Sequence, residues 1–182
     1  MLIFLIGMMG SGKSTIGKLL AETLQFPFYD TDTLIESIEG QTVSDIFAQK
    51  GEGYFRTLEH ELISNWKLSH GVVATGGGLP CHNRLMDILY QKGVTIYLES
   101  SVEDMVTRIG NDVSRPLLYS KSIQEKQKII RQILKTRTPI YKLSRLKIKN
   151  NSSPEVVVTK IIKKLKKQLA DDHFNSLMAA LG

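Results

Sequence analysis

The sequence has little of what stabilises a secreted protein or anchors a membrane protein. Cys81 is the only cysteine, so no intramolecular disulfide can form, and a reducing cytoplasm is the simplest location. No apolar run approaches the ~20 residues that a membrane-spanning helix needs. The apolar run at 2–6 is short and lacks a basic leader, which favours a core strand over a signal peptide. We therefore expect a cytoplasmic protein without a membrane partner.

Metal-ligand patterns and an excess of acidic residues are also missing. The four histidines and the cysteine are scattered, without the short spacings that zinc ligands show. The 24 Lys and Arg residues outnumber the 18 Asp and Glu residues, which gives a net charge of +6. This excess favours an anionic ligand, which leaves open nucleic acid, an anionic membrane surface, and a small phosphorylated or carboxylated substrate.

Much of the positive charge lies in one segment, at 160–167. Apolar residues recur around this segment at helical spacing, namely Val157, Val158, Ile161, Ile162, Leu165 and Leu169. This pattern predicts a terminal helix that packs on a sheet and exposes a solvated basic face. Binding of nucleic acid or membrane by the lysines is the alternative, and we expect neither partner.

Apolar runs alternate with helical patterns along the 182 residues, which predicts one α/β domain over 1–170 with a parallel sheet. We expect strands at 2–6, 27–30, 72–75, 94–98 and 145–149. We expect helices at 13–24, 32–39, 43–50, 53–68, 83–91, 101–109, 122–137 and 154–169. Ser100 with Glu103 matches a capping box, and Pro154 fits the first turn of a helix. The tail at 171–182 breaks the pattern and has no assigned role.

One motif has a specific chemical meaning. The sequence Gly7-Met8-Met9-Gly10-Ser11-Gly12-Lys13-Ser14 lies between the first predicted strand and the first predicted helix. This is the context of a P-loop, whose glycines let backbone N–H groups turn towards a polyphosphate. Lys13 supplies a charge for the outer phosphates, and the hydroxyl of Ser14 suits Mg²⁺. We predict nucleotide binding at Gly10, Ser11, Gly12, Lys13, Ser14 and Thr15.

Two aspartates follow the second predicted strand. In extended backbone Asp30 and Asp32 would point the same way, at the sheet edge where ligands bind in open α/β folds. One could hold Mg²⁺ through water, and the other could accept a proton from an acceptor hydroxyl. The alternative is an Asp that caps the next helix, which explains one of the pair more easily than both.

Two further segments carry groups that suit an anionic acceptor. Arg56 and Glu59 lie three residues apart on one predicted helix face, so Glu59 could orient the guanidinium of Arg56. For this spacing alone, a plain surface ion pair is the better interpretation. A buried strand runs into Gly76-Gly77-Gly78, which exposes backbone N–H groups and permits close approach of a ligand.

Two more arginines lie near predicted turns. Arg115 belongs to the segment 111–122, which has neither helical nor strand period and where we expect a mobile lid. From there it could close onto phosphate charge as an arginine finger. Arg137 ends a predicted helix before the last strand. Taken singly, each arginine is more typical of a solvated surface residue.

Taken together, the motifs resemble those of the shikimate kinase family. They are GMMGSGKS, DTD at 30–32, FRTLE at 55–59, GGG at 76–78, RPLL at 115–118 and RTPIY at 137–141. They follow the family's order and span most of residues 1–160. The resemblance implies a three-layer α/β/α P-loop kinase fold with a five-stranded parallel sheet in the order 2-3-1-4-5. It also implies a monomer that uses ATP and Mg²⁺ to phosphorylate the 3-hydroxyl of shikimate.

The resemblance also assigns the acceptor side of the site. It implies a substrate-binding segment at about 32–61 and a base at Asp32. The implied shikimate ligands are Asp32, Arg56, Gly77, Gly78 and Arg137.

On the donor side, the resemblance implies catalytic roles for Lys13 and Arg115 in addition to Asp32. Arg108 and the backbone around Pro154 match the family's adenine-flanking positions. No apolar strand ends in the aspartate that commonly serves Mg²⁺ in P-loop enzymes, so the metal would rest on Ser14 and, through water, on Asp30.

Two alternatives remain. A related small-molecule kinase, such as one for gluconate, would share the fold and the P-loop. A non-catalytic nucleotide-binding module would need neither the two aspartates nor the lid arginine.

Overall fold

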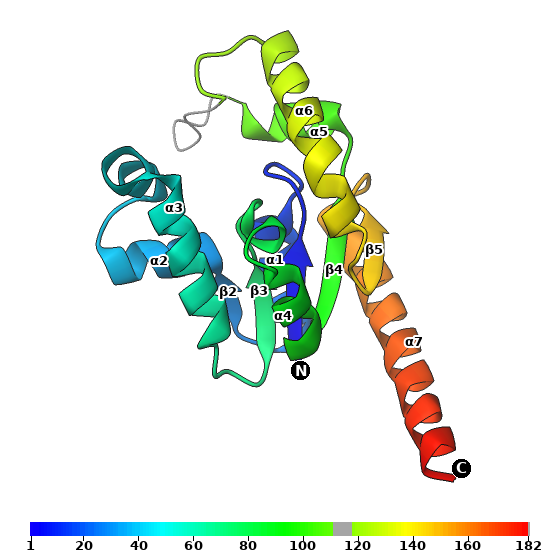
Figure 1. The fold of residues 1–182 in the computed structure, drawn as a ribbon. Coiled ribbons are helices and arrows are strands. Elements are labelled where there is room, and N and C mark those ends of the chain that lie inside the picture. Colours follow the sequence, from blue (N-terminus) through cyan, green and yellow to red (C-terminus); the bar gives the residue numbers. More distant parts are fainter. Residues whose placement is uncertain (111–117, 182) are drawn as a thin grey trace.

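The central strands are apolar at every position, as strands of a parallel sheet covered on both faces must be. The computed structural model describes the backbone of residues 1–110 and 118–181, and the side chains of that range up to residue 170. Five strands pair in parallel in the order β2-β3-β1-β4-β5. They are β1 Leu2–Ile6, β2 Phe28–Asp30, β3 Gly71–Ala74, β4 Val94–Glu99 and β5 Leu146–Lys149. The predicted fold class and strand order are confirmed (Figure 1).

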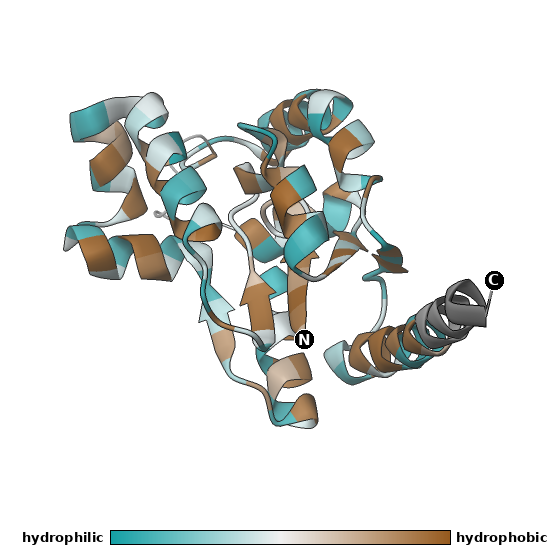
Figure 2. Cartoon of the chain, turned by 60° about the horizontal axis from the view of Figure 1, so that its bottom comes forward, coloured by the Kyte–Doolittle hydropathy of each residue, from teal (hydrophilic) through white to brown (hydrophobic). Residues whose placement is uncertain are grey.

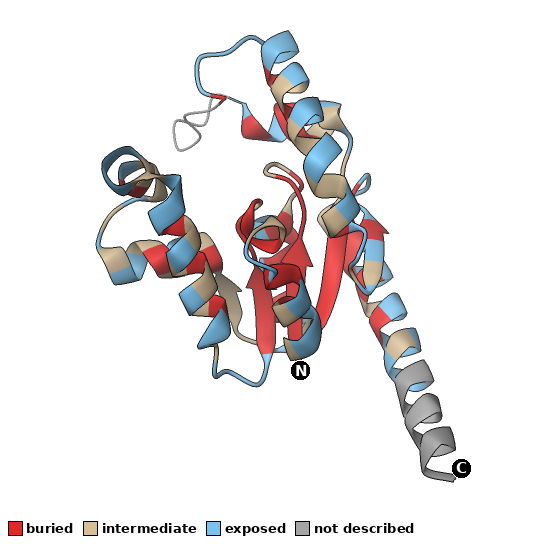
Figure 3. Cartoon of the chain, in the orientation of Figure 1, coloured by how far each residue is buried: buried red, intermediate tan, exposed pale blue. Residues whose placement is uncertain are grey.

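Helices cover both faces of this sheet (Figure 1). They are α1 Lys13–Leu24, α2 Thr31–Glu39, α3 Val43–Ser64, α4 Leu85–Lys92, α5 Val102–Ile109, α6 Ile123–Tyr141 and α7 Pro154–Leu181, with a 3-10 turn, η1, at Leu79–Cys81. Alternate residues of β1 face opposite layers. Phe4 packs with residues of α4, α5 and α6, whereas Leu5 packs with residues of α1 and α7. Figure 3 shows the resulting core as buried strands between half-exposed helices.

The helices α2 and α3 lie beside β2 and form their own small core around Ile35, Ile46 and Phe55. A break at Gly51, with φ 80° and ψ 169°, divides α3. The predicted division between a helix at 43–50 and a second one from 53 is therefore confirmed. The second segment of α3 ends at Ser64, earlier than expected.

Two helices are longer than predicted. α6 continues through Pro139 to Tyr141, so Arg137 lies inside this helix and not at its end, which corrects the sequence-based expectation. A proline removes one N–H donor and the helix tolerates this loss near its last turn, where the Lys142 N–H bonds to the carbonyl of Thr138. α7 begins at Pro154 as predicted but runs to Leu181 instead of 169.

The predicted capping box at Ser100 is wrong by one residue. Ser101 caps α5 and accepts a hydrogen bond from the Asp104 N–H, while the Ser100 hydroxyl bonds to the Ser11 carbonyl. A capping box that was not predicted starts α6, between Ser122 and Glu125.

The predicted amphipathic pattern of α7 is confirmed up to Leu165, but Leu169, which was expected on the apolar face, is 46% exposed. Val157, Val158, Ile161 and Leu165 are buried against the sheet, and the lysines between them are exposed. Hydrophobic and hydrophilic residues alternate along this helix in Figure 2. Within the described residues, no helix is both long and apolar enough to cross a membrane.

Candidate active site

The P-loop joins β1 to α1 at the carboxyl edge of the sheet, as predicted. Gly10 and Gly12 have φ values of 74° and 90°, which side chains rarely adopt, and Gly12 caps α1 without a side chain. Lys13 is buried, and its ammonium donates hydrogen bonds to the carbonyls of Gly7 and Met8 at 2.9 and 3.0 Å. Its charge is therefore held at the mouth of the loop. Ser14 and Thr15 follow in the exposed first turn of α1.

Asn150, a residue the sequence analysis missed, supports this loop. It follows β5, is buried, and donates from Nδ2 to the Ser11 carbonyl at 2.7 Å. A Cβ on Gly12 would lie 2.5 Å from the same nitrogen, and the φ of 90° also favours glycine there. The available signal was a polar residue directly after the last strand, at the sheet edge where the P-loop lies.

Arg108 also contacts the loop region. Its guanidinium donates to the Gly10 carbonyl at 3.4 Å, to the Ser100 hydroxyl at 3.0 Å and to the Asn150 carbonyl at 3.3 Å. Pro154 opens α7 a few residues after Asn150. The two positions predicted to flank adenine thus belong to segments that follow the carboxyl ends of β4 and β5.

The predicted geometry of the aspartate pair is wrong. Because α2 begins at Thr31, Asp32 lies in the first helical turn and not in extended backbone. Asp30 is the helix cap, and its Oδ1 accepts from the Asp32 N–H at 3.1 Å. Its Oδ2 accepts from the Ser14 hydroxyl at 2.8 Å, so the two predicted Mg²⁺ ligands do meet.

The donor set at Asp30 and Ser14 fits magnesium better than zinc or calcium. Among the residues described, no group of three or more His, Cys, Asp or Glu side chains could hold a metal ion. One hydroxyl and one carboxylate leave several positions for water and phosphate oxygens, which Mg²⁺ retains in kinase sites.

Asp32 and Glu59 converge on the glycine segment after β3. The Gly76 N–H donates to the Thr31 hydroxyl at 2.8 Å, which fixes the start of the segment beside α2. A Cβ on Gly76 would lie 2.6 Å from Oδ1 of Asp32 and 3.0 Å from Oε1 of Glu59. Two carboxyl groups therefore lie against the backbone of Gly76, where a larger residue would force one of them to move.

Arg56 lies across this segment and is held by two glutamates. Its Nη1 donates to Oε2 of Glu59 at 2.6 Å, and its Nε and Nη2 donate to Oε1 of Glu52 at 3.1 and 2.7 Å. A Cβ on Gly78 would lie 2.8 Å from both Nη1 and Nη2, so the end of the guanidinium rests on this glycine. The glycine run and the arginine thus form one surface.

The pair between Arg56 and Glu59 is not the plain surface ion pair that spacing alone favoured. The Glu59 side chain is 0% exposed, and its Oε1 has no hydrogen-bond partner among the described residues. Burial raises the pKa of Glu59 to about 7, although the neighbouring Arg56 favours the charged form. A buried carboxylate of this kind fixes the position of its arginine.

Arg137, from α6, faces the same cluster. Its positive charge acts on Glu52 and Glu59, and also on the buried hydroxyl of Tyr141. Tyr141, which was missed as a site residue, donates to the Gly77 carbonyl at 2.6 Å, and burial raises its pKa. Its position at the end of the RTPIY motif was the signal. Burial likewise raises the pKa of the Cys81 thiol, which makes it a poor nucleophile.

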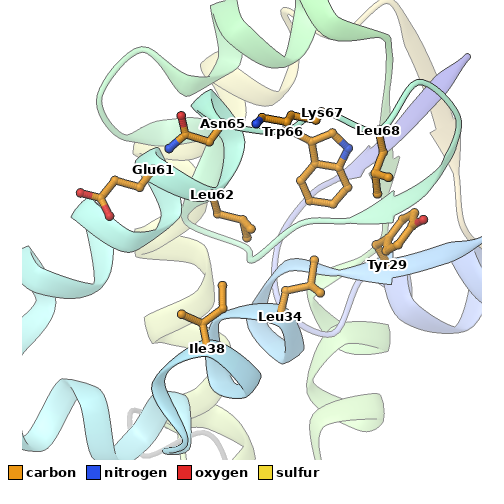
Figure 4. A pocket seen from close by; sticks show the side chains of 9 residues that line it. All are labelled: Tyr29, Leu34, Ile38, Glu61, Leu62, Asn65, Trp66, Lys67 and Leu68. Atoms are coloured by element: carbon orange, nitrogen blue, oxygen red, sulfur yellow. The ribbon is translucent and has the colours of Figure 1, made fainter.

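The predicted lid at 111–122 and its Arg115 fall largely outside the described residues, since 111–117 are not described. A separate cavity of about 390 Å³ lies between β2, α2 and the end of α3 (Figure 4). Its lining residues are Tyr29, Leu34, Ile38, Glu61, Leu62, Asn65, Trp66, Lys67 and Leu68. None of them is a predicted site residue.

A phosphate-binding loop, a parallel sheet in the order 2-3-1-4-5 and an arginine on the glycine segment beside the loop define a P-loop kinase of small molecules. The family model described as shikimate kinase matches residues 9–166. Shikimate kinase of Sulfurihydrogenibium is 42% identical over 168 residues, which cover 91% of this chain and 98% of the relative. The chain belongs to the shikimate kinase family.

Solved structures agree with this assignment. Shikimate kinase from Acinetobacter baumannii in complex with shikimate superposes with a TM-score of 0.82 and 35% identity, covering 92% of this chain and 93% of that one. The enzyme from Aquifex aeolicus gives 0.77 and 33%, covering 93% and 99%. A gluconokinase from Sinorhizobium meliloti gives a TM-score of 0.58 at 18% identity, covers 96% of both chains, and supports the fold alone.

Proposed function

We propose that this chain transfers the γ-phosphoryl group of ATP to the 3-hydroxyl of shikimate, giving shikimate 3-phosphate and ADP for aromatic amino-acid biosynthesis. The observation that carries the proposal is the cluster of Arg56, Arg137 and Asp32 around the glycine segment, beside the P-loop. Two cations suit one carboxylate, and an aspartate suits neighbouring hydroxyls.

On the donor side, the P-loop amides from Gly10 to Thr15 would receive the phosphates, and Lys13 would move from the loop carbonyls to the outer phosphates. Ser14 and Asp30, already in contact, would hold Mg²⁺, with Asp30 acting through water. Bound Mg²⁺ would neutralise charge on the phosphate oxygens. Arg108 and Pro154 would flank the adenine.

On the acceptor side, Arg56 and Arg137 would clamp the carboxylate of shikimate, and the Gly77 and Gly78 backbone would line its ring. Asp32 would accept the proton of the 3-hydroxyl as that oxygen attacks the γ-phosphorus. Catalysis of phosphoryl transfer depends mostly on positioning the two substrates and on stabilising the charge of the transferred group, and this arrangement of cations would provide both. Arg115 would add a charge from the lid.

The test is product identification in mixtures of enzyme, ATP, Mg²⁺ and one acceptor. With shikimate we expect one phosphorylated product whose phosphorus couples to the proton on C3 in a ³¹P–¹H correlation spectrum. Coupling of the phosphorus to a proton on another carbon would contradict the role of Asp32. Faster turnover of gluconate than of shikimate would contradict the assigned substrate. We expect a cytoplasmic monomer. Sedimentation velocity would check that the protein is a monomer.

A further inference from the structure

The guanidinium of Arg56 offers two edges that can bind a carboxylate through paired hydrogen bonds. The Nη1–Nη2 end rests on Gly78, and Nη1 is held by Glu59. The other edge, Nε with Nη2, donates both of its hydrogen bonds to Oε1 of Glu52. A carboxylate of this chain therefore occupies the edge through which an incoming carboxylate would bind.

The two glutamates differ sharply in exposure. The side chain of Glu59 is 0% exposed, whereas that of Glu52 is 58% exposed. Breaking a buried charge pair leaves an uncompensated charge, so Glu59 stays on Arg56. An exposed pair is weak because water solvates a released carboxylate, so Glu52 is readily displaced.

The carboxylate of Glu52 also faces the second arginine of the proposed clamp. Its hydrogen bond with Arg56 holds the pKa of Glu52 below its usual range, and the charges of His82 and Arg137 act in the same direction. Glu52 thus lies in the electrostatic environment that is proposed for the substrate carboxylate.

The backbone places Glu52 there. Gly51, with φ 80° and ψ 169°, breaks α3, and Glu52 follows this break directly, one helical turn before Arg56. The i,i+4 spacing then brings the two side chains together. Because the Glu52 side chain is exposed, it can leave Arg56 without displacing the packed residues of α3.

We propose that Glu52 is a displaceable stand-in for the acceptor carboxylate: it holds Arg56 in place before substrate binds and competes with the substrate for the Nε–Nη2 edge. This inference rests on the proposed function, since it assumes that Arg56 binds the carboxylate of the acceptor molecule. Removing Glu52 then strengthens acceptor binding instead of weakening it.

The test compares Glu52→Gln with Glu61→Gln, a matched change of an exposed glutamate on the same helix that does not contact Arg56. We expect Glu52→Gln to lower the KM for shikimate about two- to fivefold, the range of an exposed ion pair, and to leave the KM for ATP unchanged. Shikimate methyl ester, which lacks the charge, should show no gain. Glu52→Ala repeats the measurement without a side chain that can bond to Arg56.

A KM for shikimate that rises or stays constant in both Glu52 variants would overturn the inference, as would an equal gain with the ester. The contact is checked without turnover by the ¹⁵Nε–H resonance of Arg56, assigned with Arg56→Lys. It should shift in Glu52→Gln and on adding shikimate to the wild type, but not in Glu61→Gln. No shift in Glu52→Gln contradicts the contact. A wild type that shows the contact but neither binds nor phosphorylates shikimate contradicts the proposed function instead.

Discussion

Glu59 is a carboxyl group whose surroundings differ strongly from water, since its side chain is 0% exposed. Burial raises its pKa from 4.5 to about 7, so the folded protein holds this proton more tightly than the unfolded chain. Between these two values the folded state binds more protons. The contribution of Glu59 to the free energy of unfolding therefore falls as pH rises through this window and levels off above it.

Relative to Glu59→Gln, which cannot ionise, the wild type should lose about 1–3 kcal/mol of unfolding free energy between pH 5 and pH 8. Urea denaturation of both proteins at the two pH values measures this difference. A difference between the two proteins that does not change with pH would show that the Glu59 pKa is not raised.

The arginine clamp gives a second prediction for single residues. Arg56→Ala or Arg137→Ala should raise the KM for shikimate at least tenfold while the KM for ATP changes less than twofold, because each removes a charge-assisted contact with the acceptor. Arg84→Ala is the control, since Arg84 is 89% exposed and pairs only with Asp87 among the described residues. Equal effects on both substrates would contradict the assignment.

At this scale, sequence reasoning found the groups but not their environments. The spacing of Arg56 and Glu59 predicts their contact, yet their burial depends on Gly76 and Gly78, which come from a distant segment of the chain. Asp30 and Asp32 were identified with the wrong geometry, because the cap starts α2 one residue early. The role of Asn150 could not be predicted, because its hydrogen-bond partner Ser11 is 139 residues away in the sequence.

The break in α3 is the feature with the clearest consequence for a whole element. Gly51 adopts φ 80° and ψ 169°, a region open almost only to glycine, although a Cβ added there would meet nothing within 4 Å. Gly53 is equally uncrowded and has no positive φ. Substitutions at these two positions therefore distinguish the effect of backbone strain, which only Gly51 would show, from that of steric contact, which neither would show.

Gly51→Ala should destabilise the protein by about 1–3 kcal/mol, whereas Gly53→Ala should stabilise it by about 0.5–1 kcal/mol through helix propensity. Urea denaturation measures both. Similar effects of the two substitutions would mean that the break in α3 is absent in solution.

Element boundaries could be predicted where a local signal dominates. Pro154 starts α7, and the helical pattern divides α3 near Gly51, as the sequence indicates. The end of α6 could not be predicted. Pro139 is typical of a helix end, but the helix continues to Tyr141, which is buried in the core. Ser100 has the sequence context of a helix cap, but its hydroxyl donates a hydrogen bond to the P-loop carbonyl of Ser11 instead.

For the molecule as a whole, the strand order was predicted through the resemblance to the shikimate kinase family, which rests on the order of the motifs, and the sheet confirms it. The net charge of +6 is concentrated on the exposed face of α7, whose opposite face packs on the sheet. We interpret these lysines as solvating a packed helix and not as binding a partner.

Replacing Lys163, Lys166 and Lys167 together with Gln should leave shikimate turnover within about twofold and thermal stability nearly unchanged, since exposed charges contribute little. Lys164 is kept because it bonds to the Lys147 carbonyl. By contrast, Ile161→Ala, at a fully buried position, should cost about 2–5 kcal/mol. Salt-sensitive nucleic-acid binding that the triple variant loses would contradict this interpretation.

The central claim is that the P-loop serves a shikimate acceptor site, and ADP release with and without shikimate tests it most directly. In a coupled assay with ATP and Mg²⁺, we predict slow basal hydrolysis and a large, saturable increase in ADP release on adding shikimate. Folded protein that binds ATP but releases ADP at the same rate with and without shikimate would contradict the account.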